Sequence, residues 1–141
     1  MQTALKRSQN WSRLLPCGLI LAFFSLTAFI QFNTDPVARL GALTGGNITA
    51  EDFKKHEGLN AVIDEKNQIR ECKVTSFNLI RVAKKQDPVE VIHRSAKFNT
   101  KSKVLVEKAT AGDVYYIDEV NARCPGDLEN RKINSLVFKI K

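Results

Sequence analysis

The sequence predicts a mainly β fold, a β-sandwich with one short helix, preceded by an N-terminal membrane or signal helix. Three observations support this prediction. Residues 14–34 carry no charged side chain and follow a basic flank. Beyond residue 58, apolar and polar residues alternate in short segments, which is the period of a half-buried strand. Turn-forming residues separate these segments about every ten residues, as is typical of a sandwich.

The composition limits the chain to one globular domain. Its 141 residues are 43% hydrophobic and 26% charged, which excludes a disordered tail. Residues 1–32 carry three bases and no acid, whereas residues 33–141 carry 19 bases and 15 acids, a net charge of +4. Because that charge is modest and its bases lie in separate segments, we expect no nucleic-acid binding.

The N-terminal apolar segment predicts export. A membrane-spanning helix needs about 20 apolar residues, whereas a signal peptide needs about 7–15. The bulky end of the run, Phe29–Phe32, favours an uncleaved anchor, and cleavage after Ser25–Thr27 remains the alternative. The basic flank stays in the cytoplasm in either case. We therefore divide the chain into residues 1–34, the signal peptide or membrane anchor, and the exported residues 35–141.

The first elements of the exported part follow from turn and capping signals. Residues 44–47 form a turn cluster, and Thr49 with Asp52 resembles a capping box that starts a helix over residues 50–57. Gly58 is a typical residue just beyond a helix end. A strand is predicted next, over residues 59–63.

The remaining elements are predicted from apolar alternation. The longest strand candidate spans residues 69–83, and the shift of its apolar phase near Thr75–Ser76 indicates either a bulge or a strand covered on both faces. Residues 101–109 fit a helix and a strand equally well. The other predicted strands are residues 89–93, 114–124 and 133–140. The strand over 114–124 should place Val114, Tyr116, Val120, Ala122 and Cys124 on one face, and Pro125-Gly126 fits a type II turn.

Cys72 and Cys124 both lie in the apolar phase of predicted strands. An exported domain can form a disulfide between them, and such a bridge would contribute about 4 kcal/mol on the chain-entropy model. Two buried free thiols are the alternative. Two isolated cysteines do not supply the four ligands of a zinc site, so we expect no metal.

No pattern indicates catalysis. His56 and His93 stand alone, and no phosphate-binding, nucleophile-elbow or metalloprotease motif occurs. Asp118 and Glu119 are adjacent on a strand, so they should point to opposite faces. We therefore predict no catalytic residue, no cofactor and no enzymatic activity.

Short motifs along the exported part resemble, in order and spacing, the C-terminal domain of the GldM/PorM gliding-motility and type IX secretion family over about residues 36–141. These motifs are Thr44-Gly45-Gly46, Gly58–Ala61, Val74–Phe77, Phe98, Gly112–Tyr116, Ala122–Gly126, Arg131 and Phe138–Ile140. The resemblance implies an immunoglobulin-like sandwich. It also implies a periplasmic domain, anchored in the inner membrane by residues 14–34. In that family a long shaft precedes this domain, but here only about residues 33–40 separate it from the membrane segment, so a short accessory form is expected.

The predicted function is a non-catalytic, protein-binding accessory of the gliding-motility or type IX secretion machinery. Its expected partners are envelope proteins of that machinery, the inner membrane through the N-terminal helix, and a second copy of the chain. Lys97, Lys101 and Lys103 are candidates for steering an acidic partner, and a plain solvated loop is the alternative that their pattern favours. The alternative is a small secreted inhibitor or hydrolase-like factor unrelated to secretion.

Overall fold

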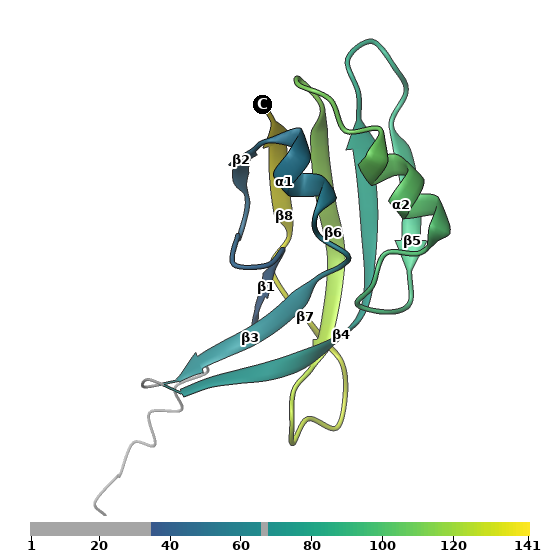
Figure 1. Cartoon of the computed structure of the whole chain (residues 1–141). Helices are drawn as coiled ribbons and strands as arrows, with labels where there is room; N and C mark the ends of the chain where they lie inside the picture. Colours follow the sequence, from purple (N-terminus) through teal and green to yellow (C-terminus); the bar gives the residue numbers. More distant parts are fainter. Residues whose placement is uncertain (1–34, 66–67) are drawn as a thin grey trace, which may run out of the picture. The chain divides into compact units, whose positions relative to one another are not determined.

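The computed structural model describes residues 35–65 and 68–141, and the mainly β prediction is confirmed. One hydrogen-bonded sheet, which curls, carries the strand order β1-β3-β4-β6-β8-β2, with β5 paired to β4 and β7 paired to β6 (Figure 1). The strands are β1 (Val37–Arg39), β2 (Gly46–Ile48), β3 (Asn60–Glu65), β4 (Gln68–Val82), β5 (Val89–His93), β6 (Val114–Arg123), β7 (Arg131–Lys132) and β8 (Leu136–Ile140). The helices are α1 (Ala50–Lys54) and α2 (Thr100–Glu107).

The long strand β4 organises the sheet by changing partners along its length. Its first residues, up to Cys72, pair with β3, and from Lys73 onward it pairs with β6. Residues 77–81 of β4 also pair with β5 on the other edge. The sheet therefore turns at β4, and its concave face encloses the core.

Of the two interpretations of the phase shift near Thr75–Ser76, the bulge is confirmed. Between the pairs Val74–Ala122 and Ser76–Asn121, β4 has one extra residue. A second shift follows in β6, where Glu119 has a φ of +51°. The two bulges compensate each other, so apolar residues on both sides of them, such as Val74 and Phe77, are buried in the same core.

The predicted apolar face of residues 114–124 is wrong in its first half. Tyr116 is 37% exposed, whereas Tyr115 and Ile117 are fully buried. The extra residue in β6 shifts the alternation by one, so the buried face continues through Val120 and Ala122 as predicted.

Helix α1 begins where the capping signal predicts. Thr49 Oγ1 accepts a hydrogen bond from Asp52 N (3.1 Å) and donates one to Asp52 Oδ2 (2.9 Å). The helix ends at Lys54, three residues before the predicted end at residue 57. Its buried Phe53 packs on Tyr115 and Phe138, with ring centroids 4.5 and 5.9 Å apart.

Most of the segment that fits helix and strand equally well is helix α2, so residues 35–65 and 68–141 contain two helices rather than the one predicted. The Asn99 side chain accepts a hydrogen bond from Ser102 N (3.0 Å) and caps its first turn. Leu105 and Val106 are buried, and the Tyr115 hydroxyl donates to the Leu105 carbonyl (2.6 Å). Both helices thus cover the face of the sheet that carries Tyr115.

The turn cluster at residues 44–47 contributes a strand that the sequence does not indicate. Gly45 and Gly46 have φ values of +134° and +103°, and β2 pairs in parallel with β8. Because β2 and β8 are about 90 residues apart in sequence, their pairing produces no pattern in the local sequence of either strand. The predicted membrane segment, residues 14–34, lies outside the described residues. Within the described ranges, no helix is long and apolar enough to cross a membrane.

Candidate interaction surface

The titratable residues that the sequence singled out lie apart from one another. His56 follows α1 and packs against Gly41, whereas His93 is buried at the end of β5. Glu119 is exposed and bound to Lys132 Nζ (2.7 Å). Within the described ranges, no three His, Cys, Asp or Glu side chains form a group suited to a metal ion. These residues therefore do not build a common site.

Cys72 and Cys124 are joined by a disulfide, with their Cα atoms 4.2 Å apart. Both side chains are buried in the core. Cys72 is the last residue of β4 paired with β3, and Cys124 directly follows β6. The bridge therefore lies at the point where β4 changes partners, and its place in the fold is structural.

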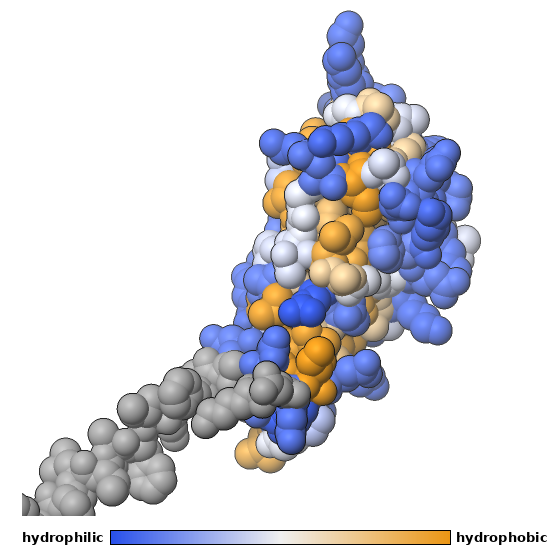
Figure 2. All heavy atoms as spheres, turned by 60° about the vertical axis from the view of Figure 1, so that its left-hand side comes forward, coloured by the Kyte–Doolittle hydropathy of each residue, from blue (hydrophilic) through white to orange (hydrophobic). Residues whose placement is uncertain are grey.

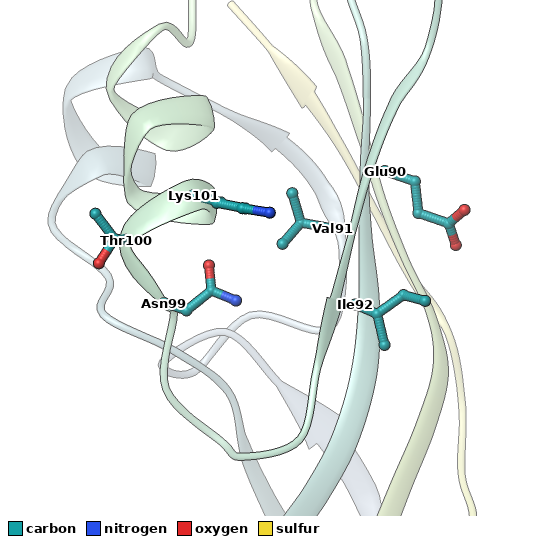
Figure 3. Close-up of a pocket in the computed structure, with 6 residues that line it drawn as sticks. All are labelled: Glu90, Val91, Ile92, Asn99, Thr100 and Lys101. Atoms are coloured by element: carbon teal, nitrogen blue, oxygen red, sulfur yellow. The ribbon is translucent and has the colours of Figure 1, made fainter.

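A groove lies between β5 and the first turn of α2. It has a volume of about 520 Å³, and Glu90, Val91, Ile92, Asn99, Thr100 and Lys101 line it. Figure 3 shows the Val91 and Lys101 side chains between strand and helix, with Glu90 and Ile92 on the other side of β5. Within the described part of the chain, β5 pairs with β4 alone, so its second edge faces this groove.

A buried histidine holds α2 against β5. His93 Nε2 lies 2.8 Å from Ser102 Oγ, and Ser102 Oγ donates to the Asn99 carbonyl (2.9 Å). The serine therefore links the His93 ring to the first turn of α2. The ring stacks on Phe77 with centroids 4.1 Å apart, and burial lowers the pKa of His93 below its ordinary value of 6.5. This contact sets the spacing between the two walls of the groove.

Exposed apolar side chains lie on the outer face of the sheet as well. Tyr116 and Val137 are opposite each other on β6 and β8, and each is more than one third exposed. Ile92 on β5 is 65% exposed. Figure 2 shows a band of hydrophobic surface between hydrophilic regions on the side of the domain turned toward the viewer. The domain thus offers apolar surface at its sheet as well as at the groove.

The three lysines named from the sequence are separated by the structure. Lys101 lines the groove beside β5, whereas Lys103 lines a smaller hollow of about 160 Å³ with His56 and Phe98. Lys97 lies where the chain pairs with Gly58. Sequence reasoning missed Asn99 and Ile92 as groove residues. Asn99 could have been found as a cap, because asparagine before a helix is a start signal.

Comparison with known protein families gives a match over most of the chain. The family model described as the GldM C-terminal domain matches residues 27–141, which is most of the chain. No curated protein matches the sequence.

Proposed function

Because the chain belongs to the GldM C-terminal domain family, we propose that residues 35–141 act as a non-catalytic protein-binding module of the gliding-motility and type IX secretion machinery. The family match is the observation that carries the proposal. The GldM family is a component of that machinery in the cell envelope and is not a known enzyme family. The partners we propose are other envelope proteins of the same machinery.

The geometry supports binding better than catalysis. The surface of the described residues offers an open strand edge on β5, a groove beside it, and exposed apolar side chains on the sheet. Open edges and apolar faces are used for protein contacts, because they offer unpaired backbone groups and area to bury. The named histidines and carboxylates do not converge, which a hydrolase would require.

We also propose that the domain lies in the periplasm and is held at the inner membrane by residues 14–34. The basic flank before this segment and its uncharged length support that orientation. Protease added to intact spheroplasts should digest residues 35–141. A domain that resists the protease until the cells are lysed would contradict this placement. Sequencing the N-terminus of the mature protein will show whether the segment is retained.

The binding role is tested by affinity capture. The tagged full chain should recover gliding or type IX secretion proteins from detergent-solubilised envelopes. An unrelated membrane-anchored periplasmic protein with the same tag serves as the control. If the captures are indistinguishable, and deletion of the gene leaves secretion and gliding intact, the proposed function is wrong.

A further inference from the structure

We propose that the groove between β5 and α2 binds an extended, acidic segment of a partner protein, which adds to the sheet as a strand beside β5. This inference rests on the proposed function and names the binding site and the chemistry it recognises. Three observations carry it: an apolar strand edge without lysine, the direction of its backbone groups, and the distribution of charge.

The edge of β5 carries apolar side chains and no lysine, the residue that most often blocks strand addition. Exposed edges are commonly protected by lysines or by a covering loop. On β5 the exposed side chains include Val89 (46% exposed) and Ile92 (65% exposed), and the strand contains no lysine. Pro88 precedes the strand, and the charged side chain of Glu90 is held on the other side of β5 by Asn78. An apolar edge beside a groove is suited to an added strand.

The hydrogen-bond pattern indicates which backbone groups are free. In antiparallel pairs, successive residues point their backbone groups alternately toward and away from the partner strand. The Ile140 carbonyl accepts a hydrogen bond from Gly112 N, and Ile140 N donates one to the Asp113 carbonyl, both at 2.9 Å. The backbone groups of Ile140 therefore point toward β6, and this fixes the alternation across the sheet. Following the registers from β8 through β6 and β4 places the backbone groups of Glu90 and Ile92 on the open edge. A partner strand would bond to these two residues.

The segment that supplies the helical wall of the groove has a positive net charge, and Lys101 is its base that lines the groove. Residues 94–108, which contain α2 and the loop before it, carry five bases and one acid, a net charge of +4. The remaining residues of 35–141 carry 14 bases and 14 acids, so the whole excess charge of the domain lies in this segment. None of the ion pairs in the described ranges involves one of these five bases.

Lys101 places a positive charge beside the open edge of β5. Its side chain extends from α2 into the groove toward β5 (Figure 3). The first turn of α2 contains no acidic residue, and the amino end of a helix itself favours negative charge. The Glu90 carboxylate in the lining accepts a hydrogen bond from Asn78 Nδ2 (2.8 Å) and points away from the groove. An acidic strand therefore meets attraction from the helix and hydrogen bonds from β5.

The test uses the full chain in phosphatidylcholine nanodiscs and a short labelled peptide that alternates valine with glutamate. Binding is followed by fluorescence anisotropy, and a peptide with glutamine in place of glutamate is the charge control. Lys101→Glu should weaken binding about tenfold or more. Lys139→Glu, an equal charge change at an exposed position on β8, should leave the affinity unchanged. Added salt should weaken binding of the acidic peptide and leave binding of the neutral peptide nearly unchanged.

A proline substitution tests the strand addition. Ile92→Pro removes a backbone N–H on the open edge and none within the sheet, so the fold should persist while peptide binding is lost. Ile92→Ala keeps that N–H and should retain binding. The unfolding midpoint of each variant shows whether it is folded. Equal binding by Ile92→Pro and Ile92→Ala, or equal weakening by Lys101→Glu and Lys139→Glu, would overturn the proposal.

Three further outcomes separate this proposal from its alternatives. If the nanodisc-held chain binds phosphatidylglycerol vesicles through Lys101 and ignores the peptide, the basic segment serves a lipid surface and the proposal is wrong. If Ile92→Pro and Lys101→Glu still capture the secretion or gliding proteins as well as the unaltered chain, the groove is not the docking site, although the proposed function stands. Failure of the unaltered chain to capture them contradicts the proposed function itself.

Discussion

Four buried polar or charged side chains among the described residues form two pairs. One pair joins the sheet to the residue after α2, and the other joins it to the first turn of α2. Arg81 on β4 donates to Asp113 Oδ2 from Nε (2.9 Å) and Nη2 (2.7 Å), and its Nη2 also donates to the Lys108 carbonyl (3.0 Å). The second pair is His93 with Ser102. Together with the buried Leu105 and Val106, these two contacts hold α2 against the sheet.

The Arg81–Asp113 pair should be costly to break from one side. Asp113→Ala leaves a buried guanidinium without its counter-charge, so we expect a loss of about 3 kcal/mol in the free energy of unfolding. Urea denaturation measures this value. The exposed pair of Lys132 with Glu119 is the matched control, and Lys132→Ala should cost about 0.5 kcal/mol or less. Similar losses in the two variants would show that Arg81 is solvated.

His93 predicts a pH-dependent stability. Its Nδ1 is buried without a hydrogen-bond partner in the described residues, and burial lowers its pKa in the folded state. The unfolded chain therefore takes up a proton first as the pH falls. The contribution of neutral His93 is fully present above pH 6.5 and is lost progressively below it, toward the lowered folded-state pKa.

The measurement is urea denaturation between pH 7.5 and about pH 5, above the range in which most carboxylates titrate. His93→Phe keeps a ring on Phe77 and should remove the loss of stability in this window. His56→Phe, at a partly exposed position, should leave it in place. If the stability of His93→Phe falls with pH as it does in the unaltered chain, the loss arises from titratable groups other than His93.

At the scale of elements, the connections are held by close backbone approach. Gly58 joins α1 to β3 and forms a bridge with Lys97, flanked by hydrogen bonds from Leu59 N to Ala96 O and from Phe98 N to Glu57 O, both 2.8 Å. A Cβ at Gly58 would lie 2.8 Å from the Lys97 Cα. The sequence suggested that Gly58 marks the end of a helix, but α1 already ends at Lys54. Gly58 is instead required by the close packing of the two backbone segments.

Gly58→Ala should lower the free energy of unfolding by about 2 kcal/mol, because two backbone segments must separate to admit the methyl group. Glu57→Ala, the exposed neighbour, should change it by about 0.5 kcal/mol at most. Chemical denaturation compares the two. An unaffected Gly58→Ala variant would mean that the 94–98 loop moves freely away from β3.

At the scale of the whole domain, the disulfide lies where the sheet turns. Cys72 is the end of the β3–β4 pairing, and Lys73 begins the pairing of β4 with β6. The bridge spans 52 residues of sequence and links the two halves of the curled sheet. Closing a loop of that size restricts the unfolded chain strongly.

We expect the Cys72→Ala, Cys124→Ala double variant to lose about 4 kcal/mol in the free energy of unfolding. In denaturant without reductant, mass spectrometry should show alkylation at Cys17 alone if the N-terminal segment is retained. Reduction should expose two further thiols. Alkylation of Cys72 and Cys124 in the unreduced protein would show that they are not bridged.

The sequence by itself determined the β content, most strand positions, the start of α1 and the shift of apolar phase near Thr75. These features depend on periodicity, caps and turns within a few residues of each other. The turn at Pro125-Gly126 is of this kind, and Asp127 N donates to the Cys124 carbonyl (3.0 Å) as expected for it. Local signals also placed Cys72 and Cys124 in the apolar phase of their strands.

Only the tertiary structure decided the rest. It showed that residues 100–107 are a helix, that the second bulge buries Tyr115 instead of Tyr116, and that Gly46–Ile48 pairs with the last strand. The sequence also could not predict the groove, because Lys101 and Ser102 meet β5 only after α2 folds back across the sheet. Non-local pairing and side-chain packing leave no periodic trace in one chain, since they depend on residues that are distant in sequence and adjacent in space.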